Sequence, residues 1–369
     1  MAIVTTTGSL SATNLSASNT ITAANYNADN TVGTVSYADG TLYTFNGSFA
    51  FDNAGNLSGN NLSNVTISEN GTVVTQISDV NTLPQATQDF VDTGNQLGFV
   101  GFFLSGNDSI TGSAGANALD GFSGSDTLTG GLGSDVLNAG DGNDLIFGGE
   151  GLVSPDDGDD VITGGAGLDS LFGNAGDDVI FGGTGAFSPT DVSSEFLHGG
   201  RGNDSLFGNG GNDTLFGGEG VDVAFGGDGD DVIYGGWQQF DPTDTGDSLV
   251  GGNGNDSLFG NGGDDSLSAG NGDDVLNGGV GNDSYVFDFS TMGTDTVFVF
   301  EGAGASTGDV LVFSDASNNI TTDTNTILSL IVYENGNAII DFDSLGSNLD
   351  VVINNVAENA ITAEDINII

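Results

Sequence analysis

A nine-residue repeat governs what this chain can fold into. Between residues 112 and 286 the unit reads Gly-Gly-x-Gly-x-Asp-x-(Leu/Ile)-x, with clear copies at residues 199–207 and 251–259. Seventeen units can be written in register, and a half unit at residues 106–111 precedes them. A short fixed period over so much of a chain predicts a solenoid, in which each unit buries its apolar face against its neighbours.

Each of the nine positions has a predicted role. The first six are expected to form a turn, because glycine is needed where φ is positive and where two backbones approach closely. The last three form a minimal strand whose middle side chain points inward. Two units make one coil of 18 residues, so successive units alternate between two parallel sheets. The predicted inward row is Leu119, Leu128, Leu137, Ile146, Ile162, Leu171, Ile180, Leu197, Leu206, Leu215, Ala224, Ile233, Leu249, Leu258, Leu267, Leu276 and Tyr285.

The sixth position carries an aspartate in nearly every unit, and two units depart from this rule with Asn117 and Glu195. Because every second unit stacks on the same side, these carboxylates should form two columns at strand spacing, where like charges repel strongly. A cation must therefore neutralise them. The predicted metal-ligating residues are Asp108, Asp126, Asp135, Asp144, Asp160, Asp169, Asp178, Asp204, Asp213, Asp222, Asp231, Asp247, Asp256, Asp265, Asp274 and Asp283.

The composition indicates which cation this is. The chain has 52 acidic residues, one Arg, no Lys, one His and no Cys. Of the acidic residues, 32 lie between residues 108 and 283, where the metal is expected. The donors are then carboxylate and backbone carbonyl oxygens, and flexible all-oxygen sites select Ca²⁺ over zinc or copper.

The nonapeptide resembles the hemolysin-type calcium-binding repeat of the repeats-in-toxin (RTX) proteins, which type I systems secrete. The resemblance implies an all-β fold, in which a parallel β-roll (a calcium-binding β-solenoid) lies between β-rich N-terminal and C-terminal capping domains. It also implies Ca²⁺ between stacked turns, held by the sixth-position aspartates and turn carbonyls, at up to about 15 sites. The alternative is a disordered linker rich in Gly and Asp, and the inward aliphatic row, which keeps its phase across the units, argues against it.

Composition shifts divide the chain into three predicted domains, namely residues 1–103, 104–286 and 287–369. In the first, alternating apolar and polar residues between Gly, Asn and Asp turns predict antiparallel strands. Pro84 opens a predicted short helix at 85–92, and the apolar segment 98–104 is expected to cap the first coil. The strands predicted in the first domain are 32–37, 41–45, 48–51, 65–68 and 72–77, and those in the third are 297–300, 310–313, 327–333, 338–342 and 349–353.

Three units are interrupted by inserts, at residues 152–158, 186–193 and 237–243. Each insert has a large apolar residue followed by Pro and Asp, and the one Trp of the chain, Trp237, lies in the third. Such inserts are either tolerated loops or a contact surface, because exposed aromatic residues mark interfaces.

The net charge and the terminal segments limit which partners and which cellular location are possible. A net charge of −51 excludes nucleic acid as a partner, and no apolar run approaches the length of a transmembrane segment. Residues 1–18 have neither the basic region nor the apolar core of a Sec signal peptide. The resemblance implies type I secretion instead, through an uncleaved signal in the C-terminal domain. We therefore expect an extracellular location, secreted or cell-surface associated, with the type I secretion machinery as a partner.

No catalytic constellation is found in the sequence, and we predict that the protein is not an enzyme. His198 lies at an outward ninth position, where a solvated side chain is expected, and the chain lacks His-Glu-x-x-His. The third positions lack the repeated Thr that a flat ice-binding face would need. The sequence favours a structural subunit of an S-layer, sheath or filament that folds and self-associates on binding Ca²⁺. A calcium-dependent adhesin is the alternative, with a secreted RTX enzyme or toxin less favoured, and cell-surface polysaccharide is a further candidate partner.

Overall fold

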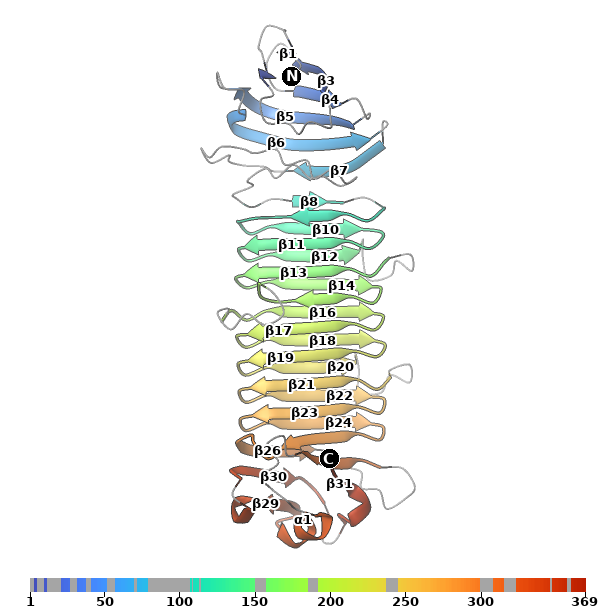
Figure 1. The fold of residues 1–369 in the computed structure, drawn as a ribbon, viewed down its shortest axis with the longest axis vertical. Coiled ribbons are helices and arrows are strands. Elements are labelled where there is room, and N and C mark those ends of the chain that lie inside the picture. Colours follow the sequence, from blue (N-terminus) through green and yellow to red (C-terminus); the bar gives the residue numbers. More distant parts are fainter. Residues whose placement is uncertain are drawn as a thin grey trace. The chain divides into compact units, whose positions relative to one another are not determined.

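The computed structural model describes the chain in two compact units, residues 1–171 and 172–369 (Figure 1). It gives the backbone of the strands between residues 3 and 78. With side chains, it describes residues 107, 109–112, 114–149, 157–184, 192–236, 245–298, 308–314, 323–345, 347–356 and 360–369. Asp108, the three inserts, the predicted helix at 85–92 and the apolar segment 98–104 lie outside the described residues.

The first part of unit 1 is an antiparallel sheet. Strands β3 to β7 pair in chain order, β7 pairs with β8, and β1 pairs with β2. The five strands predicted here are confirmed, and two of them, 41–45 and 48–51, form one continuous strand. The bounds are β1 Ile3–Val4, β2 Leu10–Ser11, β3 Ile21–Tyr26, β4 Val32–Tyr37, β5 Thr41–Phe51, β6 Leu57–Glu69, β7 Thr72–Ser78 and β8 Ser109–Thr111.

The repeats of unit 1 form two parallel sheets. One has the order β8-β10-β12 and the other β9-β11-β13. Leu128 pairs with Ile146, and Leu119 pairs with Leu137, so strands two units apart are neighbours as predicted. The bounds are β9 Ala118–Asp120, β10 Thr127–Gly131, β11 Val136–Asp141, β12 Leu145–Gly149 and β13 Val161–Ala166, and β14, Ser170–Ala175, spans the boundary between the two units.

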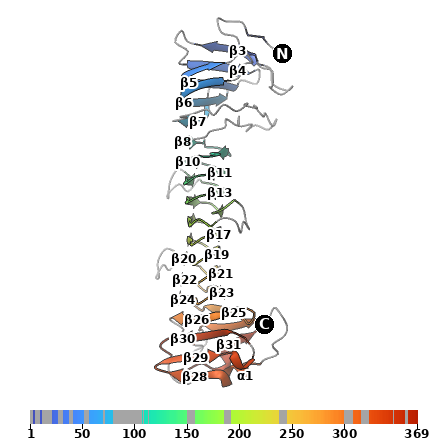
Figure 2. The same ribbon diagram turned by 90° about the vertical axis from the view of Figure 1, so that its left-hand side faces the viewer.

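The repeats of unit 2 follow the same plan. Even-numbered strands β16 to β24 form one parallel sheet, odd-numbered strands β15 to β25 form the other, and Figure 2 shows them on opposite sides of each coil. This confirms the predicted parallel β-roll. The bounds are β15 Val179–Phe181, β16 Phe196–Arg201, β17 Ser205–Gly210, β18 Thr214–Glu219, β19 Val223–Asp228, β20 Val232–Gly236, β21 Ser248–Asn253, β22 Ser257–Gly262, β23 Ser266–Asn271, β24 Val275–Val280 and β25 Ser284–Asp288.

The core of each unit is the predicted inward row. All seventeen side chains of that row are buried, with at most 3% of their surface exposed. Apart from the buried His198, the residues on either side of each inward residue are at least partly exposed, as in β17, where Leu206 is buried between the partly exposed Ser205 and Phe207. Strand alternation around a single aliphatic residue thus explains why a nine-residue unit suffices for a core.

The strands are longer than the three residues predicted. In β16 and β18 the ladder continues through Gly200↔Gly218 to Arg201↔Glu219, so the first three positions of the unit belong to the strand and not to the turn. The second-position glycine has positive φ, 121° at Gly200, yet its backbone groups still pair with the next coil. Glycine permits this because it has no Cβ to clash with the preceding coil, which at Gly200 would be the carbonyl oxygen of Asn174.

The two sheets continue beyond the last repeat. β26, Gly293–Phe298, pairs in parallel with β24, and β27, Val310–Ser314, pairs in parallel with β25. β30, Leu349–Ile353, and β31, Ile366–Ile368, extend the sheets further, and β30 then pairs antiparallel with β29, Asn337–Asp341. The parallel pairing of the roll therefore runs past residue 286, the predicted domain boundary.

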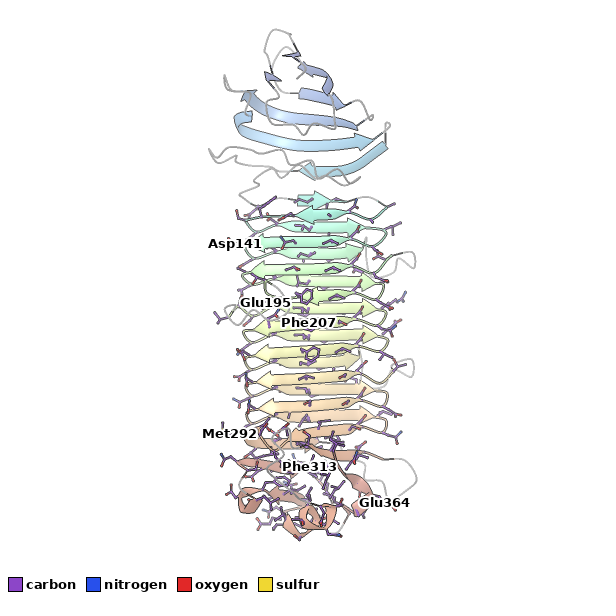
Figure 3. The ribbon with its side chains drawn as sticks, viewed as in Figure 1. Asp141, Glu195, Phe207, Met292, Phe313 and Glu364 are labelled. Carbon is purple, nitrogen blue, oxygen red and sulfur yellow. The ribbon has the colours of Figure 1, made fainter. Side chains whose placement is uncertain are left out.

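The C-terminal strands enclose a second apolar cluster. Phe289 and Phe342 meet edge-on at 5.2 Å between ring centroids. The ring of Phe313, which is labelled in Figure 3, lies 5.3 Å from that of Phe342. The predicted strand 327–333 is wrong in its first half, which is the helix α1, Thr324–Leu330, followed by β28, Ile331–Glu334. Asp323 caps this helix by accepting a hydrogen bond from the backbone N–H of Thr326, which favours a helix over an extended start. None of the described helices is long and apolar enough to cross a membrane.

Candidate metal centre

The sixth-position side chains lie where each turn enters a strand, and they are buried. Of the sixteen aspartates predicted as ligands, the fifteen that the structure describes expose at most 3% of their surface. Glu195, which occupies the same position, lies toward the edge of the strands in Figure 3. The turn therefore places a carboxyl group beneath the surface in almost every unit, which is costly unless the charge is compensated.

In most of the described repeats, one carboxylate oxygen of the aspartate holds the preceding coil. Its Oδ1 accepts a hydrogen bond from the backbone N–H of the sixth residue two units earlier, for example from Asp204 to Asp222 at 2.7 Å and from Asp213 to Asp231 at 2.8 Å. Asn117 and Glu195, which depart from the motif, keep this bond through their own backbone N–H groups, to Asp135 and Asp213. Among the described residues, the columns are thus hydrogen-bonded ladders within residues 117–169 and within residues 178–309.

The other carboxylate oxygen faces the interior without a hydrogen bond in several units. This holds for Oδ2 of Asp135, Asp144, Asp204, Asp231 and Asp256, all of them buried atoms. A buried carboxylate oxygen that accepts no hydrogen bond loses its hydration without replacement. A cation bound beside Oδ2 would supply the missing interaction.

The space around Oδ2 fits a small hard cation. A Cβ built on Gly199 would contact Oδ2 of Asp204 and lie 2.6 Å from the carbonyl oxygen of Gly217 in the following coil. The same two kinds of oxygen converge beside Gly226, where they come from Asp231 and Gly251. Carboxylate and carbonyl oxygens from successive coils are the donors that Ca²⁺ prefers. Among the described residues no three acidic or histidine side chains meet at one point.

Burial raises the pKa of these carboxyl groups. It is the main cause of a pKa of about 8 at Asp204 and Asp231 and of about 7 at Asp135 and Asp256. Repulsion from neighbouring aspartates raises the pKa values further, while the hydrogen bond from the preceding coil lowers them. Without a metal, the folded state therefore favours the protonated carboxyl groups of Asp204 and Asp231 at neutral pH.

The chain's own basic residues do not neutralise the columns. Arg201, the only Arg or Lys, lies at a third position, where its Nε is 3.3 Å from Oε2 of Glu219 and both side chains are half exposed. His198 was predicted to be solvated, and this is wrong, because only 4% of it is exposed. Its ring lies between Phe172 and Phe216, at 6.0 and 6.1 Å, and burial lowers its pKa, which favours the neutral form.

Two further aspartates continue the columns, and the repeat pattern did not identify them. Asp295 and Asp309 are buried, and their Oδ1 atoms accept the backbone N–H groups of Asp274 and Asp283 at 3.2 and 3.0 Å. The signal that could have found them is a Gly one or two residues before Asp and an aliphatic residue two residues after it, in residues 293–297 and 308–311.

One comparison with known protein families agrees with this site. A family model described as RTX calcium-binding nonapeptide repeat (4 copies) matches residues 104–121, 120–151, 155–186, 191–224, 216–239 and 244–285. A search of curated proteins found no match. The crystal structure of the extracellular lipase LipA from Serratia marcescens is similar over 61% of this chain and 39% of the lipase chain, with 20% identity and a TM-score of 0.29. The chain thus spans less than half of that lipase.

RTX repeats bind Ca²⁺, and the buried carboxylate and carbonyl oxygens of the described turns are donors suited to that ion. Residues 104–285 carry RTX calcium-binding nonapeptide repeats, and these repeats form a calcium-binding parallel β-roll.

Proposed function

We propose that this protein is a secreted structural protein of the cell surface or extracellular matrix, without catalytic activity, which folds and assembles when it binds Ca²⁺. The observation that carries the proposal is the pair of buried carboxylate columns in a chain with one Arg and no Lys. The sixth-position aspartates, with turn carbonyls, would hold the ions. The structured state then depends on an ion from outside the chain.

This dependence suits a protein that works outside the cell. Extracellular calcium modules bind at roughly 10⁻⁴–10⁻³ M, so such sites fill in the medium and stay empty in the cytosol. RTX repeat proteins are typically secreted. The chain would thus remain unfolded until export and fold on the outside.

Outward aromatic rows on the roll support assembly. Phe181, Phe207 and Phe225 stack along one sheet with centroids 5.0 and 5.2 Å apart, and Phe225 remains 37% exposed. Tyr234 stacks between Phe216 and Phe259 on the other sheet, at 4.7 and 4.9 Å. Exposed aromatic rings are enriched in protein interfaces, and Ca²⁺ would also remove much of the repulsion due to a net charge of −51.

Assembly is tested by measuring particle size in millimolar Ca²⁺ with light scattering and electron microscopy. We expect filaments or sheets from the wild type, because non-closing contacts between copies propagate, and at least a tenfold weaker association for Phe225→Thr. Val221→Thr, which alters an exposed apolar side chain in a neighbouring turn, is the matched control and should assemble normally. A wild type that stays monomeric at high concentration would reject assembly and favour the adhesin.

Export by a type I system is proposed for the C-terminal segment, whose composition departs from the repeats at about residue 287. Residues 287–369 fused to a passenger should direct it into the medium of a host that has a type I exporter, and the passenger alone should stay inside. Retention of the fusion, with its expression unchanged, would contradict this assignment.

A further inference from the structure

One peptide bond of this chain follows a basic side chain. The chain has a single Arg, Arg201, and no Lys, so the bond between Arg201 and Gly202 is the only one with either residue on its N-terminal side. Trypsin-class serine proteases cleave at such bonds, because an acidic residue in their specificity pocket binds the basic side chain. A protease of this class can therefore cut the chain at one place, in the middle of the repeats.

The side chain of Arg201 is open to such a protease. It lies at the end of β16, where its Nε is 3.3 Å from Oε2 of Glu219, and the two side chains are 48% and 47% exposed. A surface ion pair of this kind contributes little to stability. An acidic specificity pocket could thus replace Glu219 at little cost, and the side chain alone marks Arg201 as a cleavage site.

The peptide bond itself is engaged on both sides. The carbonyl oxygen of Arg201 accepts a hydrogen bond from the backbone N–H of Gly176 in the preceding coil at 2.9 Å. The backbone N–H of Gly202 donates to the carbonyl oxygen of Glu219 in the following coil at 2.8 Å. Both polar groups of the bond that a protease must bind are therefore held within the roll, although the Arg201 side chain is exposed.

The backbone around this bond also has the wrong shape for a protease. A protease binds its substrate as an extended strand, through main-chain hydrogen bonds. Gly200 and Gly202 have φ values of 121° and 128°, outside the range of an extended strand. The backbone N–H of Asn203 is held by Oδ1 of Asp177 at 2.8 Å, so the chain cannot shift without breaking a further bond. Cleavage therefore requires this coil to leave the sheet.

We propose that the bond between Arg201 and Gly202 is a latent cleavage site for trypsin-class proteases, closed in the folded roll and opened when the coils around it unfold. Hydrolysis adds one water across the C–N bond and leaves the carboxylate of Arg201 and the amine of Gly202. The dependence of this opening on Ca²⁺ rests on the proposed function, in which the roll folds on binding the ion. The folded protein then resists this protease class, whereas a chain without ions is cut into residues 1–201 and 202–369.

The test is digestion of the full chain with trypsin in millimolar Ca²⁺ and in EDTA, followed by intact mass and by circular dichroism of each sample. A small arginine amide, hydrolysed in the same tubes, normalises the protease activity. We expect a single cut, after Arg201, in EDTA, and cleavage about a hundredfold slower in Ca²⁺. Arg201→Gln should stay intact under both conditions.

Further variants separate the closed bond from the rest of the fold. Val192→Arg in the Arg201→Gln background moves the basic residue to an 82% exposed position outside the strands, and this chain should be cut in Ca²⁺. Asp204→Ala removes a buried carboxylate beside the closed bond and should speed cleavage after Arg201 about tenfold in Ca²⁺. Asp350→Ala removes an acidic side chain from β30 and should leave the rate unchanged.

Rapid cleavage in Ca²⁺ while the β signal is complete would overturn the closed site and leave Ca²⁺-dependent folding standing. Resistance in EDTA with the β signal retained would instead reject Ca²⁺-dependent folding and leave the closed site standing. Resistance in EDTA after the β signal is lost would show that Arg201 is no cleavage site. If the chain with Val192→Arg also resists in Ca²⁺, the bonds at Arg201 are not the cause of the protection, which overturns the proposal.

Discussion

Removal of Ca²⁺ with EDTA at neutral pH is expected to abolish the β-structure of the repeats. Each folded coil buries carboxylates whose Oδ2 atoms, at Asp204, Asp231 and Asp256 among others, accept no hydrogen bond. Burial of such groups costs several kcal/mol per ion without compensation, more than the total stability of most domains once several are summed. Circular dichroism should show loss of the β signal in EDTA and its recovery when millimolar Ca²⁺ is added.

Acid should partly replace Ca²⁺ in the same experiment. The pKa of Asp204 and of Asp231 is about 8 in the folded chain, against 3.8 for an ordinary aspartate, so the metal-free folded state binds more protons than the unfolded state between these values. The stability of the metal-free fold therefore rises as the pH falls from about 8 towards about 4. Full β-structure in EDTA at alkaline pH would contradict the calcium dependence. If acidification does not stabilise the metal-free fold, the buried carboxylates are not the cause of the calcium dependence.

Asp231→Ala should be among the most damaging single substitutions in the roll. It removes the Oδ1 acceptor for the backbone N–H of Asp213 and the Oδ2 that faces the interior. We expect a loss of about 3 kcal/mol or more at saturating Ca²⁺, from a buried N–H without this acceptor and from a weakened ion site. Thermal unfolding in millimolar Ca²⁺ and the number of bound ions measure the effect.

Asp230→Ser is the matched control, because Asp230 is the adjacent acidic residue but is exposed. The Oδ1 of Asp230 accepts a hydrogen bond from the backbone N–H of Asn255 at 2.8 Å. A serine can accept the equivalent bond, because the hydroxyl of Ser194 accepts one from the backbone N–H of Asn212. The effect of Asp230→Ser should stay within about 0.5 kcal/mol. Equal losses from Asp230→Ser and Asp231→Ala would show that charge alone matters, and not burial.

The repeats could be predicted from the sequence because one period fixes both the core and the site. Once Leu206 is assigned to the inward row, the strand alternation and the 18-residue coil place Leu206 beside Ala224 and Asp204 beside Asp222. No knowledge of side-chain packing is needed for either inference. The same reasoning identified Ca²⁺, since it used only the donor atoms that the columns offer.

The features that the sequence did not predict depend on contacts between residues that a nine-residue pattern does not describe. Asp295 was missed because its spacing from Asp274 departs from the period, although the backbone bonds of the turn are the same. His198 is buried because Phe172 and Phe216 flank it from the neighbouring coils, which the outward position alone does not reveal. α1 was mistaken for a strand because its apolar residues fit either period, and the cap from Asp323 decided the outcome.

Hydrogen bonds between two successive coils of the repeats have nearly the same length whether 18 or 25 residues separate the two partners. The backbone N–H of Asp204 meets Asp222 after 18 residues at 2.7 Å, and that of Asp222 meets Asp247 after 25 residues at 2.8 Å. Seven additional residues between two turns thus leave this hydrogen bond essentially unchanged. A foreign peptide spliced into such a turn would therefore be displayed at a fixed height on the protein, and deletion of one complete coil would shorten the stack by one step while leaving every other bond in register.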